Sequence, residues 1–199
     1  MTKRQGVTLD KVVAAAFEVL DRVGASRLST REIAAELGVS MNTVMWHIRS
    51  KDRLLELMAD AIVGEVPLTD LPDDWCARAS ELLQRLRGAL LSHRDGAAIV
   101  AGTFSAEPNT LAFADGLVDA LIEGCPTRRS AAWTMWSLFY FTLGLVQEEQ
   151  SAATWHDRVA DDLDSELYPG LASVWDEFRV IDFGERFDYG IAQILRSGA

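Results

Sequence analysis

Apolar residues recur at spacings of three and four along most of this 199-residue chain, and this period limits its fold more than any other feature. In residues 9–23 the spacing is typical of an amphipathic helix that buries one face. Similar patterns fill residues 29–62 and resume after residue 75. No stretch alternates apolar and polar residues with the period of a strand. The sequence therefore predicts an all-α fold.

A proline-containing break separates a small N-terminal part from a larger one. Pro67 and Pro72 interrupt the helical pattern within residues 64–75. We therefore expect a three-helix head in residues 1–53, a connecting helix in residues 54–66 and a larger helical body in residues 67–199. Within the body the apolar pattern predicts helices in residues 75–92, 95–102, 110–123, 127–150 and 171–196.

Two short helices joined by a tight turn are predicted in the second half of the head. Ser29 and Glu32 have the spacing of a capping box at the start of the first helix. Gly38 suits the turn, and Ser40 is placed to cap the second helix. Two short helices around a glycine turn form the helix-turn-helix pattern, which is typical of proteins that bind DNA.

The second of these helices carries the residues with which a helix reads a DNA duplex. If Val44 and Ile48 face the interior, the other side chains between residues 41 and 47 project from its N-terminal end and outer surface. Asparagine pairs with adenine, threonine and methionine contact thymine methyl groups, and indole and imidazole donate to phosphates. The predicted DNA-binding residues are Thr30, Arg31, Met41, Asn42, Thr43, Met45, Trp46, His47 and Lys51. Taken alone, Met45 and Trp46 also fit half-buried positions in a small helical bundle.

Charge is distributed unevenly between the two parts. The whole chain has a net charge of −11, but residues 1–53 hold nine Lys and Arg against six Asp and Glu, a net charge of +3. The remaining residues hold ten basic against 24 acidic side chains, and all three lysines lie in the head. A basic head on an acidic body indicates an anionic partner for the head, which favours duplex DNA.

The segment STREIAAELGVSMNTVMWHIRSKDRLL resembles the DNA-binding head of the TetR family of bacterial repressors. The segments ALLSHRDGA, AGT and FTLGLVQEEQ of the body resemble the regulatory domain of its tetracycline-binding members. The resemblance implies that the predicted residues of the head contact operator DNA. It also implies a homodimer joined through a four-helix bundle of residues 127–150 and 171–196. Because the family carries Gln or Pro at the positions of Met41 and Asn42, we expect a different operator.

The sequence differs from the tetracycline-binding members at the positions that hold a magnesium–drug chelate in them. Val100 and Phe104 replace the family's histidine and arginine, and Leu82 and Leu86 replace its asparagine and phenylalanine. Glu148 is the one acid left for a metal-bound water. A hard divalent ion needs several oxygen or nitrogen ligands, so we expect neither magnesium nor tetracycline, and no other metal or cofactor.

What remains in the body is a set of apolar and aromatic residues that would suit a flat hydrophobic molecule. The predicted ligand-binding residues are Leu82, Leu86, Val100, Thr103, Phe104, Phe113, Leu117, Met135, Trp136, Phe139 and Tyr140, with His93 as a further polar group. An aromatic stripe at helical spacing is equally typical of a closed core.

These features predict a dimeric, ligand-responsive repressor that binds a palindromic operator and is released by a small apolar or aromatic molecule. Two alternatives remain: a DNA-binding regulator controlled by a protein partner, and a small-molecule binding protein without DNA function. Surplus aromatic residues at Trp133, Trp175, Phe178 and Phe187 favour a dimer, because one chain has no need to bury all four.

Several other classes are disfavoured. His93 and Asp95 lack the nucleophile and second base of a catalytic site, and we expect no enzyme activity. Cys76 and Cys125 stand far apart and outside any Cys/His cluster, which favours free thiols. No apolar run has the length of a membrane span and the N-terminus lacks an apolar signal segment, so we expect a cytoplasmic protein.

Overall fold

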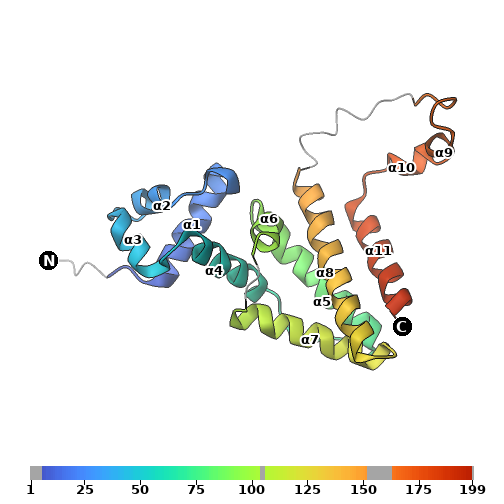
Figure 1. Ribbon diagram of the computed structural model, residues 1–199, viewed down its shortest axis with the longest axis horizontal. Helices are drawn as coiled ribbons and strands as arrows, with labels where there is room; N and C mark the ends of the chain where they lie inside the picture. Colours follow the sequence, from blue (N-terminus) through green and yellow to red (C-terminus); the bar gives the residue numbers. More distant parts are fainter. Residues whose placement is uncertain (1–5, 104–105, 152–162, 199) are drawn as a thin grey trace.

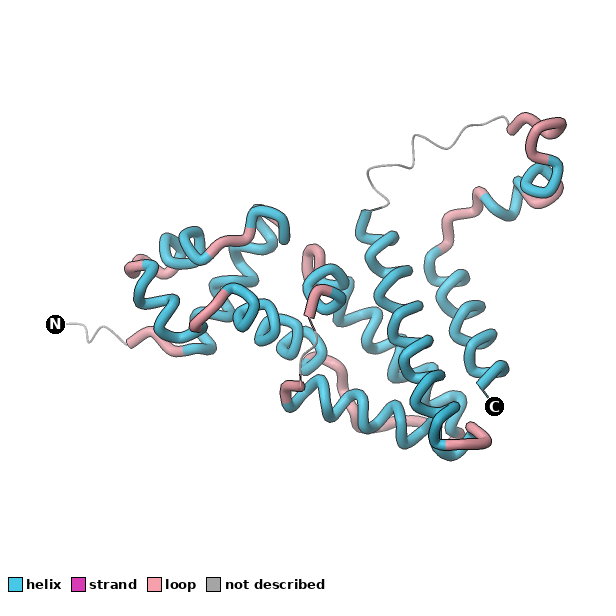
Figure 2. The backbone as a smooth tube through the Cα atoms, viewed as in Figure 1, coloured by secondary structure: helices cyan, strands magenta, loops and turns pink. Residues whose placement is uncertain are grey.

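The computed structural model describes residues 6–103, 106–151 and 163–198. Within these ranges all regular structure is helical and no strand is present (Figure 2). The prediction of an all-α fold is confirmed. No helix in the described ranges is long and apolar enough to cross a membrane.

The head is built from three helices and the start of a fourth. Each of these four helices begins at a hydroxyl side chain that accepts a backbone N–H bond from its first turn: Thr8, Ser29, Ser40 and Ser50. Fully buried Val12, Leu20, Ile33, Val44 and Ile48 form their common core. The elements are α1 (Leu9–Val23), the short 3-10 helix η1 (Ala25–Arg27), α2 (Thr30–Glu36), α3 (Met41–Ile48) and α4 (Lys51–Gly64).

The body packs its longer helices around the far end of α4. Helices α5, α7 and α8 contact one another, α6 fits between α4 and α8, and α11 packs along α8 (Figure 1). The elements are α5 (Trp75–Leu91), α6 (Gly96–Ala101), α7 (Pro108–Gly124), α8 (Arg128–Ser151), α9 (Pro169–Ala172), α10 (Trp175–Phe178) and α11 (Phe183–Gly198).

Helix α4 belongs to both parts of the molecule. It begins beside α3 in the head, and it packs against α6 and α7 in the body (Figure 1). Leu54 and Met58 are fully buried, as is Ile62 one turn further along. A rotation or tilt of this one rigid element therefore moves the head relative to the body.

The prediction of a single helix in residues 171–196 is wrong. The chain instead forms the two short helices α9 and α10, and α11 begins only at Phe183. Asp182 explains the late start, because its Oδ1 accepts the N–H of Glu185 at 2.9 Å and so supplies the cap of a new helix.

Helix α11 covers one face of α8 within the same chain. Phe187 is fully buried, and its ring lies 6.1 Å from that of Phe141. A Cβ atom on Gly190 would stand 2.1 Å from Phe141 Cζ, so only glycine lets the helices approach this closely. Of the four aromatic residues that one chain was not expected to bury together, Phe187 is therefore part of the chain's own core. Trp133 and Phe178 are exposed, whereas Trp175 is half-buried.

Candidate nucleic-acid interface and ligand cavity

The exposed face of α3 is where the predicted DNA-reading residues lie. Val44 and Ile48 are fully buried, which fixes the orientation of the helix. Trp46 is 78% exposed and Met41 is 50% exposed, and Asn42 is also exposed. Leaving an indole in water is costly unless a partner covers it. The alternative of Trp46 as a core residue does not agree with its exposure.

The remaining predicted contacts of α3 are half-buried, and each has a neighbour in the head. Met45 packs against the core. The His47 ring meets the Trp46 ring edge-on, with 4.7 Å between centroids. Ser40 caps the helix by accepting the Thr43 N–H at 3.2 Å, and the two hydroxyl oxygens lie 2.9 Å apart. The first turn of α3 is therefore rigid.

Three more predicted contacts lie at helix starts. Thr30 and the exposed Arg31 open α2, and the exposed Lys51 opens α4. Backbone N–H groups and the helix dipole favour anions at such positions, and the two basic side chains strengthen that preference. This arrangement suits the phosphates that flank a groove occupied by α3.

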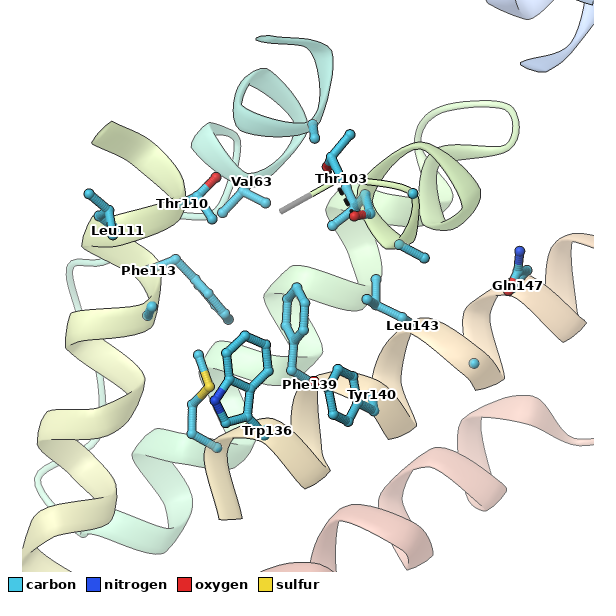
Figure 3. Close-up of a pocket in the computed structure, with 17 residues that line it drawn as sticks. Val63, Thr103, Thr110, Leu111, Phe113, Trp136, Phe139, Tyr140, Leu143 and Gln147 are labelled. Atoms are coloured by element: carbon cyan, nitrogen blue, oxygen red, sulfur yellow. Dashed lines mark hydrogen bonds between the residues drawn. The ribbon is translucent and has the colours of Figure 1, made fainter. Parts of the chain in front are cut away.

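The body contains a cavity of about 640 Å³ enclosed by four helices (Figure 3). It is lined by Ala59 and Val63 of α4, Val100 and Ala101 of α6 with Gly102 and Thr103 after it, Thr110, Leu111, Phe113 and Ala114 of α7, and Met135, Trp136, Phe139, Tyr140, Leu143, Gly144 and Gln147 of α8. This volume lies within the range of small-molecule sites. No charged side chain is among these described lining residues.

Seven of the predicted ligand residues line this cavity and three do not. The seven are Val100, Thr103, Phe113, Met135, Trp136, Phe139 and Tyr140. Leu82 and Leu86 of α5 and Leu117 of α7 are fully buried in the core instead, where α5 packs directly against α7 and α8. Phe104 lies outside the described residues.

Aromatic rings of α8 form one wall of the cavity. The Trp136 and Tyr140 rings are stacked, with 5.3 Å between centroids and 26° between planes. Phe139 meets Trp136 edge-on at 6.2 Å. In Figure 3 these rings lie on the opposite side of the hollow from Thr103 and Thr110. Such a wall favours a planar aromatic molecule, which gains apolar contact and ring stacking together.

No carboxylate or imidazole is among the described lining residues of the cavity. Val100 presents an apolar side chain to it, and the exposed Glu148 is not in its lining. Glu149 pairs with Arg87, whose Nη2 lies 2.7 Å from its carboxylate. In the described part of the chain no three His, Cys, Asp or Glu residues group together as metal ligands. Thiol pairs are also absent there, since Cys76 and Cys125 are both free.

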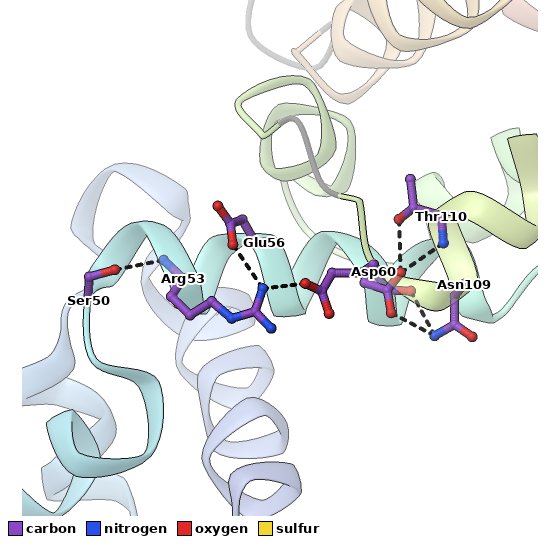
Figure 4. Close-up of polar contacts among 7 residues, drawn as sticks. Ser50, Arg53, Glu56, Asp60, Asn109 and Thr110 are labelled. Carbon is purple, nitrogen blue, oxygen red and sulfur yellow. Dashed lines mark hydrogen bonds and ion pairs between the residues drawn. The ribbon is translucent and has the colours of Figure 1, made fainter.

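A buried carboxylate joins α4 to the first turn of α7. Asp60, 8% exposed, accepts three bonds: the Thr110 N–H at 2.8 Å, the Thr110 hydroxyl at 2.9 Å and the Asn109 amide at 2.9 Å (Figure 4). It thereby caps α7, whose own N-cap residue makes no side-chain capping bond. Thr110 lines the cavity, so this cluster ties the cavity wall to the helix that enters the head.

The N-cap residue Glu107 is bonded about two turns earlier along α4, at Arg53. Its carboxylate accepts a bond from the Arg53 guanidinium, which also donates to Glu56 (Figure 4). The hydrogen bond from Arg53 lowers the pKa of Glu107 below its ordinary value. Arg53 stands two residues after Lys51, so this ion pair reaches the edge of the candidate DNA surface.

A second connection runs from the turn before α6 to the end of α1. Arg94 donates to the carbonyl oxygens of Asp21 at 2.9 Å and Arg22 at 3.3 Å, which closes the C-terminal end of α1. Asp95 occupies the cap position of α6, but its Oδ2 accepts the Ala25 N–H at 2.7 Å. The Asp95 side chain therefore makes no capping bond to α6 itself.

Two further features belong to this contact between the end of α1 and the turn before α6. Gly24 has φ +78°, and a Cβ atom there would stand 3.1 Å from Asp95 Oδ2. His93, expected as a polar group of the cavity, lies elsewhere: its ring is 4.5 Å from the Phe17 ring, and its Nε2 is 2.8 Å from a Glu65 oxygen. It belongs to the contact between head and body.

Two family models match this chain, and together they span most of it. Residues 12–58 match the model described as bacterial regulatory proteins, tetR family, and residues 67–197 match the tetracyclin repressor-like C-terminal domain. The chain belongs to the TetR family of bacterial transcriptional regulators. This family is not enzymatic, and its members bind operator DNA and small-molecule effectors. Membership makes the protein a ligand-responsive transcriptional repressor.

Relatives of this TetR-family repressor agree with it in sequence and fold. It is 34% identical to the tetracycline repressor protein class A from transposon 1721 of Escherichia coli, over 98% of this chain and 90% of that one. A possible TetR family transcriptional regulator from Streptomyces coelicolor A3(2) has a TM-score of 0.85 at 32% identity, covering 95% and 97% of the two chains. ActR from Streptomyces coelicolor, solved in complex with actinorhodin, has a TM-score of 0.86 at 26% identity over 96% of both chains.

Sequence reasoning did not find the contribution of α4 to the cavity. Ala59 and Val63 are a helical i, i+4 pair that reads as ordinary core. Thr110 and Ala114 have the same spacing on α7, so the sequence places them on one face of that helix. Neither residue type indicates whether that face borders a cavity or a packed core. The contacts of Arg94 and Asp95 join residues about 70 positions apart and have no local signal.

Proposed function

We propose that this TetR-family repressor binds a two-fold symmetric operator as a homodimer and releases it when an uncharged, planar aromatic molecule other than a magnesium–tetracycline chelate enters the cavity. The observation that carries the proposal is the course of α4. Its first residue, Lys51, follows the recognition helix, and its Ala59 and Val63 form part of the cavity wall. One helix thus touches both sites.

For the DNA side, the support is the composition and exposure of α3. Asn42, Trp46 and Met41 are exposed on a helix that Val44 and Ile48 hold against the head. We assign base reading to Met41, Asn42, Thr43 and Met45, and phosphate contacts to Thr30, Arg31, Trp46, His47 and Lys51. The assignment of residues 1–53 to DNA binding, 54–66 to the connection and 67–199 to ligand binding and dimerisation belongs to the same proposal.

For the effector, the support is the lining of the cavity. Stacked Trp136 and Tyr140 favour a flat ring system, and the lining offers no charged side chain that would pair with an ionic ligand. A small-molecule effector also agrees with ActR, a protein of the same fold that was solved in complex with actinorhodin. Named tetracycline repressors are also relatives, yet the apolar Val100 and the exposed Glu148 weigh against a metal-bound drug here.

For the dimer, the support is aromatic surface on α8 and α11. Trp133 is 61% exposed, Tyr140 63% and Tyr189 69%. Apolar rings gathered on two neighbouring helices favour burial against another chain. Two copies would place two recognition helices on one face of DNA, about 34–36 Å apart, as helix-turn-helix dimers require.

Coupling between the sites follows from the two connections described above. A molecule that fills the cavity presses on α6, α7 and α8. Asp95, at the start of α6, is bonded to the head, and α7 is bonded to the connecting helix α4 through Asp60. If the effector binds the released state about 10²–10³-fold more tightly than the operator-bound state, operator binding weakens by about 3–4 kcal/mol.

The test is selection of bound duplexes from a random pool, followed by measurement of affinity for the selected duplex by fluorescence anisotropy. We expect one palindromic site, and affinity that falls steeply with salt, by roughly one log unit per log unit of salt for each phosphate neutralised. Arg31→Ala should reduce that slope, whereas Arg128→Ala, an exposed arginine of the body, should not. A flat salt response would favour a small-molecule binding protein without DNA function.

Release by planar aromatic compounds is then measured on the same duplex. Thermal shift against an aromatic library should give stabilisation that grows with concentration. A protein that binds the duplex but no compound would favour control by a protein partner.

A further inference from the structure

Two hydroxyl groups of the cavity lining have a fixed hydrogen-bonding polarity. Two threonines line the cavity, Thr103 after α6 and Thr110 in the first turn of α7. Each hydroxyl has one hydrogen to donate and two lone pairs that accept. How that single hydrogen is used decides what the hydroxyl offers to a ligand.

Both hydrogens are already used within the protein. Thr103 Oγ1 donates to the carbonyl oxygen of Val100 at 3.1 Å, with that of Ile99 at 3.4 Å. Thr110 Oγ1 donates to Asp60 Oδ1 at 2.9 Å. Carbonyl and carboxylate oxygens only accept, so in both bonds the threonine hydroxyl must be the donor.

The bond of Thr110 is the better protected of the two. Asp60 is 8% exposed, and its carboxylate also accepts from the Thr110 N–H and the Asn109 amide. Turning the hydroxyl toward a ligand would take one bond from a buried charge, which is costlier than the bond gained. To a ligand in the cavity, both hydroxyls can therefore offer lone pairs alone.

From this polarity we infer that the effector is a planar aromatic molecule that donates hydrogen bonds, through ring hydroxyl or amine groups, to Thr103 and Thr110. The inference rests on the proposed function and narrows its ligand class. Aromatic molecules whose only polar groups are ethers or carbonyls have no hydrogen to donate. At these two positions they would place an acceptor oxygen beside an acceptor oxygen, without a hydrogen bond. The Gln147 side-chain amide, further along α8, both donates and accepts and so serves the ligand's own acceptors (Figure 3).

The test compares three compounds of one shape: a dihydroxynaphthalene, its dimethyl ether and naphthalene. Calorimetric titration of the full-length protein measures their Kd values. We expect the diol to bind at least about tenfold more tightly than the ether, the size of one hydrogen bond lost without replacement. Apolar area alone predicts the reverse order, because the ether carries two additional methyl groups.

Variants assign the effect to the two hydroxyls. Thr103→Val and Thr110→Val keep the shape but remove the acceptor, and each should reduce the preference for the diol by about tenfold or less while leaving the Kd of naphthalene unchanged. Thr103→Ser and Thr110→Ser keep the hydroxyl and should keep the preference. Unchanged naphthalene binding also demonstrates an intact cavity in the valine variants.

The outcomes separate this inference from the proposed function. Equal binding of all three compounds, or tighter binding of the ether, overturns the inference and leaves an aromatic effector in place. A diol preference that survives both valine variants also overturns it, because the donors are then recognised elsewhere. Failure of all three to bind contradicts the aromatic effector itself, and the inference with it.

Discussion

Removal of the Asp60 carboxylate tests whether the connection between α4 and α7 contributes as much as its geometry indicates. Asp60→Ala deletes three bonds of 2.8–2.9 Å and leaves the Thr110 N–H and hydroxyl without this acceptor, while the Asn109 amide keeps only the residue-60 carbonyl at 3.4 Å. Bonds to a charged group contribute about 1.5–3 kcal/mol each, but they are not additive when they share one acceptor. Loss of a helix cap alone costs about 0.5–2 kcal/mol.

These magnitudes give a net loss of about 3 kcal/mol in the free energy of unfolding, after a gain of about 0.5 kcal/mol because alanine suits the middle of α4 better than aspartate. For a chain of this size that loss corresponds to a Tm lower by about 6–12 °C. Asp60→Asn, which still accepts through one oxygen, should lose less.

The assay is urea denaturation at a fixed protein concentration, because dimerisation makes stability depend on concentration. Asp119→Ala is the matched control: it removes an exposed carboxylate from α7 and should change stability by less than about 0.5 kcal/mol. If Asp60→Ala were as stable as the control, the argument that Asp60 caps α7 would be refuted.

Three further predictions concern the DNA-binding face, the Arg53–Glu107 ion pair and the cavity. Asn42→Ala should relax preference at one base pair by about 1–3 kcal/mol, whereas Lys51→Ala should weaken binding to all sequences alike; repeated duplex selection with each variant distinguishes them. Because the Glu107 pKa lies below its ordinary value of 4.5, its bond to Arg53 stabilises the fold above that pH and is lost as the pH falls through the lowered pKa. Urea midpoints of wild type and Glu107→Gln should therefore differ at pH 7 and converge in acid, and a constant difference would contradict this. Trp136→Ala should weaken binding of aromatic compounds at least tenfold, while Trp133→Ala, outside the cavity, should leave their Kd unchanged in calorimetric titration.

The head was predictable from sequence because its signals are local. Ser29, Ser40 and Gly38 act within a few residues of where they stand, and the buried pair Val44 and Ile48 fixes the face of α3. Tertiary contacts do not have to be known for such elements to be located.

The cavity was only partly predictable, because periodicity gives the buried face of a helix but not what covers it. Leu82 and Phe113 both read as inward-facing, yet Leu82 meets a neighbouring helix and Phe113 meets a hollow. The late start of α11 was missed for another reason. Apolar residues continue through residues 171–182, and the cap at Asp182 is a single short signal within them.

The most direct test of the central claim is thermodynamic linkage between the cavity and the operator. The Kd of a bound aromatic compound is measured by calorimetry on the free protein and on the protein saturated with its selected duplex. Coupling through α4 predicts that the duplex weakens compound binding by the same factor, about 10²–10³, by which the compound weakens duplex binding. Identical Kd values with and without the duplex would contradict the account.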